Sequence, residues 1–313
     1  ILGALIIIFY TLIGGFLAVA WTDFIQGIIM FSTLVILPLV GLFELTVSGY
    51  SLNIDWSTLY AGKSGYAAFI AVIGGLSWGL GYVGQPHLIA RYMAIDKPEN
   101  ISISRNIAYT WAIPAFFGAM MIGLIGSSLI DNGLLIFNNS IISSIDQITD
   151  PEKLMPIMAK SLLPSWLAGI FICGAIAAMM STADSQLLVS TTVITKDIIK
   201  KYFIKKSNDK ELLIIGRICT VLISAIAFYM AFKSKALVFE TVSYAWGGLG
   251  SSFGPTLILT LWWKNIKKEG VVVGLIFGTL FTIFPIFPDV VTPRLSAFLL
   301  STFGVILASK IKS

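Results

Sequence analysis

Charged residues and histidine are scarce in this chain of 313 residues. Asp, Glu, Lys and Arg together make up 12% of it, whereas soluble domains carry about a quarter. His87 is the only histidine, so a catalytic site that needs a nucleophile, a histidine base and an orienting group has one candidate base. The composition therefore argues against a soluble domain and makes an enzyme the least favoured class.

Cysteine is also nearly absent. Cys173 and Cys219 both lie in apolar stretches, where we do not expect a structural disulfide, and no CxxC or Cys/His set predicts a metal centre. The net charge of +5 would suggest a nucleic-acid partner in a soluble protein. Here the basic residues fall in short loops between apolar runs, so they report membrane orientation instead.

Apolar runs of membrane-spanning length are what the chain has in abundance. It is 57% hydrophobic with a mean hydropathy of +0.90, and it begins at Ile1 inside such a run, from which we expect earlier helices to be missing. The pattern predicts an all-α polytopic membrane protein with a single transmembrane domain over 1–313. The nine expected spans are 1–19, 22–43, 66–92, 107–130, 165–195, 212–232, 239–263, 270–287 and 294–311.

The loops differ in basic content. If the N-terminus is outside, most of the 21 lysines and arginines fall in cytoplasmic loops, including the run Lys196–Lys210, or at the C-terminus. This asymmetry follows the positive-inside rule. It predicts a cell-membrane protein with a cytoplasmic C-terminus.

A polar cluster interrupts the expected span 165–195 near its centre. Ala178, Ser181, Asp184 and Ser185 fall at helical spacing on one face. A carboxylate at mid-membrane costs about 2.5 to 3.5 kcal/mol on insertion scales, so it needs a partner, a proton or a cation. The cluster indicates a site for a hard cation, whereas we expect the hydroxyls of Ser190, Thr191 and Thr192 to bond to helix carbonyls and hold neighbouring helices together.

The second aspartate of interest, Asp23, lies in the run GGFLAVAWTDFIQ at 14–26. We expect a tight turn at the membrane surface here, with Asp23 at the start of a helix. One interpretation is that Thr22 or Asp23 caps that helix. The other is that Asp23 reaches a cation held by the central helix.

The expected span 66–92 is unusually rich in glycine. Five glycines and Pro86 fall within 73–87, and each interior glycine costs a helix about 1 kcal/mol and a proline about 3 kcal/mol. We expect a broken helix that lines a cavity, with Trp78 and Tyr82 on its aromatic face. The similar composition of 243–255 predicts a second irregular helix, and the polar segment 131–164 an extracellular loop with a short amphipathic helix.

Three segments together resemble the sodium:solute symporter family, and within it the sodium/proline symporters. They are GGFLAVAWTDFIQ at 14–26, SWGLGYVGQPHLIARYMA at 77–94 and MSTADSQLLVSTTVITKD at 180–197, and SYAWGGLGSSFGP at 243–255 extends the match. The resemblance implies an inverted-repeat five-plus-five transporter bundle. About nine of its helices would be present, without the broken first core helix.

The resemblance also implies roles for individual residues. The main-chain carbonyl of Ala178 and the hydroxyls of Ser181 and Thr182 match the family's sodium site. Asp23, Asp184 and Ser185 match a second sodium position known in some members. Trp78, Tyr82, Pro86 and Tyr10 match positions associated with substrate binding and coupling.

The function expected from this resemblance is sodium-coupled symport of a small organic solute, first of all L-proline, by alternating access. The partners would be sodium, the solute and the lipid bilayer, with no nucleic acid. Pantothenate or another amino or organic acid is an alternative solute, since relatives share the sodium motif. A membrane sensor built on the same fold, or a channel, remains an alternative from another class.

Overall fold

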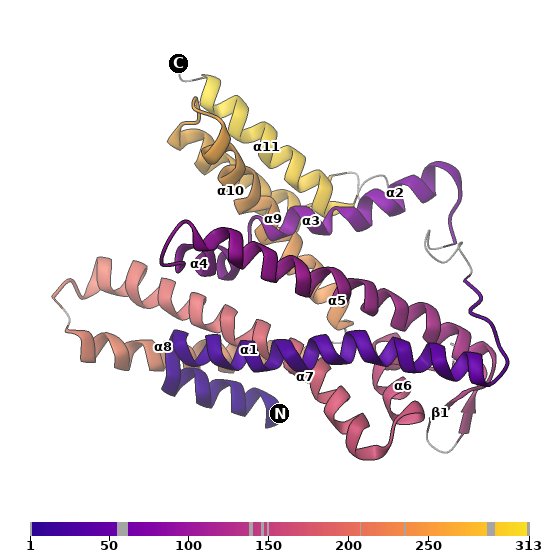
Figure 1. The fold of residues 1–313 in the computed structure, drawn as a ribbon. Helices are drawn as coiled ribbons and strands as arrows, with labels where there is room; N and C mark the ends of the chain where they lie inside the picture. The colour runs from indigo at the N-terminus through magenta and orange to yellow at the C-terminus, as the bar shows by residue number, and fades with distance from the viewer. Residues whose placement is uncertain are drawn as a thin grey trace. The chain divides into compact units, whose positions relative to one another are not determined.

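The computed structural model describes residues 2–54, 62–137, 140–144, 147–148, 150–206, 208–234, 236–286 and 292–311. Within these ranges the secondary structure is helical apart from one two-stranded hairpin (Figure 1). The long helices are α1 (Leu2–Val47), α2 (Gly65–Leu76), α5 (Asn100–Asp131), α7 (Ser165–Thr192), α8 (Asp209–Lys233), α9 (Val238–Trp262), α10 (Lys268–Ile283) and α11 (Pro293–Ile311). The shorter elements are α3 (Trp78–Tyr82), α4 (Pro86–Met93), β1 (Leu135–Phe137), β2 (Ser140–Ile142), the 3-10 helix η3 (Pro151–Lys153), α6 (Leu154–Leu162) and the π-helix η4 (Val193–Phe203).

Each of the nine expected spans contains helix over most of its described residues, which confirms the all-α polytopic fold. Six helical segments of the described chain are long and apolar enough to cross a membrane. One of them, Leu5–Val47, is 43 residues long and bends, so it covers the first two expected spans. The remaining two spans are α9, whose glycines and serines lower its hydropathy, and α10, which has 16 residues.

The bend in α1 lies at Gly15. Its φ of 56° and ψ of −151° are non-helical, and a positive φ is a conformation that residues with a side chain rarely adopt. Figure 1 shows the indigo start of the chain running back against the direction of the rest of α1. Gly15 therefore divides α1 into a first limb, 2–14, and a second limb, 16–47.

The capping interpretation of Asp23 was wrong. Asp23 lies eight residues beyond the bend, inside a continuous helix, and the Thr22 hydroxyl donates to the carbonyls of Ala18 and Val19 at 3.0 and 2.9 Å. The glycine pair at 14–15, rather than the polar residues after it, ends the first limb, because only glycine takes up the required backbone conformation without strain. Asp23 therefore lies inside the helix and does not cap it.

Two compact units make up the chain: residues 1–54 with 96–230, and residues 55–95 with 231–313. The first unit has a core where α1, α5, α6 and α7 meet. Backbones approach closely at Gly118, where an added Cβ would collide with the Leu34 carbonyl. The core residues are Leu37, Leu45, Ile122, Ile125, Leu129, Ile130, Leu135, Ile142, Ile148, Ile157, Met158, Ala159, Ala168 and Phe171.

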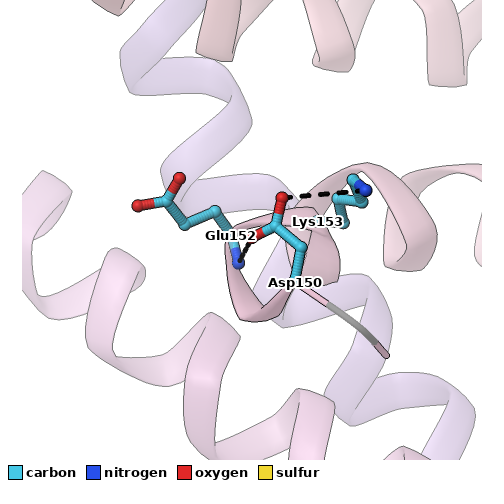
Figure 2. A network of polar contacts seen from close by, with 3 residues as sticks. All are labelled: Asp150, Glu152 and Lys153. Carbon is cyan, nitrogen blue, oxygen red and sulfur yellow. Dashed lines mark hydrogen bonds and ion pairs between the residues drawn. The ribbon is translucent and has the colours of Figure 1, made fainter. Parts of the chain in front are cut away.

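The segment between α5 and α7 contains the expected short helix, α6, together with a β-hairpin that the sequence did not predict. Strands β1 and β2 pair antiparallel, and Met158 of α6 is fully buried in the core. Asp150 caps the turn before α6: its Oδ1 accepts from the Glu152 amide at 3.0 Å and its Oδ2 lies 3.7 Å from Lys153 Nζ (Figure 2). This segment is thus packed against the helices rather than extended as a loose loop.

The second unit contains the broken helix that the glycine-rich sequence predicted. Helix α2 ends at Leu76, α3 is a five-residue helix, and residues 83–85 separate α3 from α4. Helix α3 packs on α9, and α9 packs on α10 and α11. An added Cβ at Gly250 of α9 would collide with the backbone of Gly81, so the two elements are in direct backbone contact.

The expected second irregular helix is not irregular. Helix α9 is continuous from Val238 to Trp262, with Pro255 inside it. Its glycines and serines serve close packing instead: Gly254 would meet Phe298 if it carried a Cβ, and the Ser252 hydroxyl donates to the Gly248 carbonyl at 2.8 Å. Composition alone does not separate a helix broken by glycine from one packed through glycine, because both use small residues at close approaches.

We expect Gly15→Ala to destabilise the protein by about 1 to 2 kcal/mol, because a Cβ at positive φ is strained although no other group lies within 4 Å of it. Gly123→Ala in α5 is the matched control, since its Cβ also meets nothing within 4 Å and its backbone is helical. Thermal unfolding in detergent micelles measures both variants. Equal midpoints for the two would show that the bend does not depend on glycine.

Candidate site around Asp184

Asp184 is the centre of the candidate site. It lies halfway along the continuous membrane-capable segment Ser165–Phe203, which joins α7 to η4. Its side chain is 0% exposed. A buried carboxylate at this depth needs hydrogen bonds and a compensating charge.

A hydroxyl group lies within hydrogen-bonding distance of each carboxyl oxygen of Asp184. The Tyr10 hydroxyl donates to Oδ2 at 2.5 Å, and the Ser185 hydroxyl lies 3.2 Å from Oδ1. The Ser185 hydroxyl also lies 2.9 Å from the Ser181 carbonyl. The single Ser185 proton is shared between Oδ1 and the Ser181 carbonyl, so Tyr10 supplies the main hydrogen bond to the Asp184 carboxyl group.

Tyr10 connects this carboxylate to the second aspartate. Tyr10 belongs to the first limb of α1. In the second limb, Gln26 is placed to hydrogen-bond the Tyr10 hydroxyl, and Asp23 influences that hydroxyl electrostatically. The resemblance had associated Tyr10 with substrate binding and coupling, and the structure places it among the residues expected to bind the second sodium ion. Tyr10, Asp23, Asp184 and Ser185 therefore form one polar cluster, which we call the aspartate cluster.

A second group of oxygens precedes Asp184 on α7. The hydroxyls of Ser181 and Thr182 both point back to the Ala178 carbonyl, at 3.5 and 3.1 Å. These are the back-bonds that the helix-packing interpretation describes. They also bring the three oxygens expected to bind sodium to one place, about one helical turn from Asp184.

Thr191 and Thr192 behave as the helix-packing interpretation predicted. Thr191 pairs with Thr220 of α8 at 3.0 Å between the two hydroxyl oxygens, and Thr192 donates to the Leu188 carbonyl at 2.7 Å. In the described part of the chain, no three His, Cys, Asp or Glu side chains are grouped as a metal site. The oxygens grouped on α7 are carbonyl, hydroxyl and carboxylate, which suit a hard cation.

The aromatic residues expected to bind substrate gather in the second unit around Trp246 of α9. The Trp246 ring centroid lies 4.9 Å from that of Tyr82, 6.0 Å from that of Trp78 and 6.2 Å from that of His87. Pro86 is the first residue of α4, directly after the break. Sequence analysis did not single out Trp246. The signal for it was the pair of aromatic residues in SYAW, which precedes a glycine-rich stretch.

Gln85 is a further residue that the sequence did not single out. It lies in the break between α3 and α4 and is 0% exposed. Its Nε2 donates to the carbonyls of Gly81 and Trp246 at 3.0 and 3.1 Å, while no partner for Oε1 is found among the described residues. Gln85 thus joins the broken helix to α9 through one backbone carbonyl on each side.

Comparison with known proteins places these features in a family. The sequence profile of the sodium:solute symporter family matches residues 1–278. The chain is 36% identical over 279 residues to the high-affinity proline transporter PutP of Bacillus subtilis (strain 168), covering 87% of this chain and 56% of that protein. It is 34% identical over 284 residues to the sodium/proline symporter of Escherichia coli (strain K12), covering 89% of this chain and 54% of that one.

The fold also matches a solved structure, the substrate-bound, outward-open state of a Na+-coupled sialic acid symporter. The TM-score is 0.70 at 16% sequence identity, covering 98% of this chain and 65% of that structure. The chain thus spans a little over half the length of the curated relatives it matches. Its sequence, its helices and its fold agree: this chain belongs to the sodium:solute symporter family.

Proposed function

We propose that the protein containing this chain is a sodium-coupled symporter of a small organic solute, with L-proline as the first candidate. The observation that carries the proposal is the aspartate cluster, a buried carboxylate halfway along α7 with a second aspartate acting on the same tyrosine. The names of the relatives support proline as the solute. The same relatives are transporters, which supports a protein with no enzymatic activity.

In this proposal α7 carries the sodium positions. The Ala178 carbonyl with the Ser181 and Thr182 hydroxyls binds one ion, which takes the place of the hydrogen bonds that these hydroxyls donate to the carbonyl. Asp184, Ser185 and Asp23 bind a second ion, which also offsets the charge of the two carboxylates. Tyr10 keeps the Asp184 side chain oriented toward α1.

Sodium binding is proposed to stabilise the outward-open state, which then accepts the solute before both move inward. The coupling is reciprocal, so sodium raises the affinity for the solute and the solute raises the affinity for sodium. Trp78, Tyr82 and Pro86 are the proposed solute-binding residues. Proline is a compact zwitterion with an apolar ring, which suits an aromatic group beside a helix break.

The proposal includes the cell membrane as location, with a cytoplasmic C-terminus. Its support is the clustering of lysines and arginines in alternate loops, together with the six membrane-capable helices of the described chain.

Uptake of labelled proline into proteoliposomes tests the proposed function directly. The full-length protein should accumulate proline when an inward sodium gradient is imposed, and a sodium ionophore should abolish the accumulation. A potassium gradient of the same size is the control. Uptake that ignores the sodium gradient, or that never exceeds equilibration, would contradict sodium-coupled symport.

We expect Ser181→Ala and Thr182→Ala each to raise the sodium concentration for half-maximal uptake by about tenfold, since each removes an oxygen from the ion. Thr192→Ala is the matched control, because Thr192 makes the same kind of back-bond on the same helix. It should shift the half-maximal concentration by less than about twofold. If all three variants shifted it by the same amount, the hydroxyls would only hold the helix together.

The two aspartates should act on sodium together. We expect Asp23→Asn and Asp184→Asn each to weaken sodium binding, and the double variant to deviate from additivity by about 0.5 kcal/mol or more, because the two groups share a partner. Tyr10→Phe, which removes the hydroxyl that bonds Asp184 and is influenced electrostatically by Asp23, should reduce the coupling. Strict additivity on sodium affinity would mean that the aspartates work independently.

A further inference from the structure

The break between α2 and α3 leaves a backbone carbonyl that two side chains satisfy. The Gly74 carbonyl accepts from the Ser77 hydroxyl at 2.6 Å and from Arg294 Nη2 at 3.3 Å. Inside a bilayer each polar backbone group must find a protein partner, since no water is available. One of the two donors therefore comes from α11, more than 200 residues along the chain.

The guanidinium of Arg294 also contacts Trp78, the first residue of α3. Its Cζ lies 4.8 Å from the Trp78 ring centroid, within the range of a cation–π interaction. Nη1 donates to the Ser243 hydroxyl of α9. Three elements of the second unit, α2, α3 and α9, are thus held by one side chain.

The absence of a side chain at Gly247 leaves room for the Arg294 side chain. An added Cβ at Gly247 of α9 would collide with Cγ of Arg294. Thr292, just before α11, fills the neighbouring space: its hydroxyl oxygen lies 3.5 Å from that of Ser77, and its methyl group would meet a Cβ at Gly74. Within the described ranges no carboxylate forms an ion pair with Arg294, so its charge faces the indole rather than an acidic partner.

We propose that Arg294, on α11, is a positioning residue that holds the indole of Trp78 in place. Trp78, Tyr82 and Pro86 are the proposed solute-binding residues, and Arg294 acts on Trp78 from a different helix. The proposal rests on the proposed function, because it takes Trp78 as a solute-binding residue. A planar guanidinium can bond Gly74 and Ser243 with two nitrogens while it lies over the ring, and a lysine ammonium is a point charge that cannot do both. The structure thus gives Arg294 a role that depends on its shape as well as on its charge.

Hydrogen exchange of the full-length protein, measured without solute, tests the contact itself. In Arg294→Gln the amides of residues 74–82 should exchange about threefold to thirtyfold faster. This is the range expected when the loss of a cation–π contact lowers the free energy of local opening. Arg294→Lys should give a smaller increase, since it keeps the charge. Lys310→Gln removes a cation from the other end of the same helix and should leave these amides unchanged.

Measurements of proline affinity test whether the position of the Trp78 indole affects solute binding. Arg294→Gln should weaken proline binding by about three- to tenfold, and in a Trp78→Leu background the same change should have no further effect, because Arg294 acts through the indole. Sodium affinity, measured without solute, should change by less than about twofold in Arg294→Gln. A loss of proline affinity with unchanged sodium affinity separates positioning of the indole from a general loss of the fold.

Unchanged exchange in both Arg294 variants would overturn the proposal, and so would an equal loss of proline affinity with Trp78 and with Leu at position 78. If Arg294→Gln did not fold, the comparison of Arg294→Lys with the wild type would decide. A wild-type protein that bound no proline would refute the proposed solute, while the exchange data would still show whether Arg294 holds Trp78 in place.

Discussion

The arrangement of the first unit depends on one constraint, the burial of the Asp184 carboxyl group halfway along a membrane-capable helix. The residue is fully buried, and a hydroxyl group lies within hydrogen-bonding distance of each of its oxygens. These hydroxyls come from α7 itself and from the first limb of α1. Asp23 acts on the same tyrosine from the second limb, and the limbs are brought together by the bend at Gly15. A backbone conformation that favours glycine thus determines which side chains surround a charge on another helix.

In the second unit the corresponding constraint is the broken helix. A helix break inside a bilayer exposes carbonyls, and here side chains supply donors: Arg294 and Ser77 at Gly74, and Gln85 at Gly81. Gln85 also donates to the Trp246 carbonyl of α9. The break is also where the aromatic side chains gather, including Trp78 and Tyr82, which we propose as solute-binding residues, and Arg294 contacts Trp78 as well as the Gly74 carbonyl.

Local rules predicted much of this from the sequence, and long-range contacts account for the rest. The spacing of Ser181, Asp184 and Ser185 placed them on one face, and the glycines of 73–87 predicted the break, because both follow from neighbours along the chain. The position of the bend was wrong by several residues, since Asp23 resembled a cap until the conformation of Gly15 was known. The contacts of Tyr10 with Asp184 and of Arg294 with Trp78 join residues 174 and more than 200 positions apart, and no periodicity carries such information.

The central claim is that Asp184 is held as a carboxylate whose charge is offset by sodium. Infrared difference spectroscopy of the full-length protein, recorded on addition of sodium with Asp184→Asn as reference, measures this most directly. The account predicts a sodium-induced change in the ionised carboxylate bands that is absent from the variant, with no loss of a protonated carboxyl band. Loss of a protonated carboxyl band in the wild type alone, with release of a proton, would show that a proton had balanced the charge of Asp184 before sodium bound, and would contradict the account.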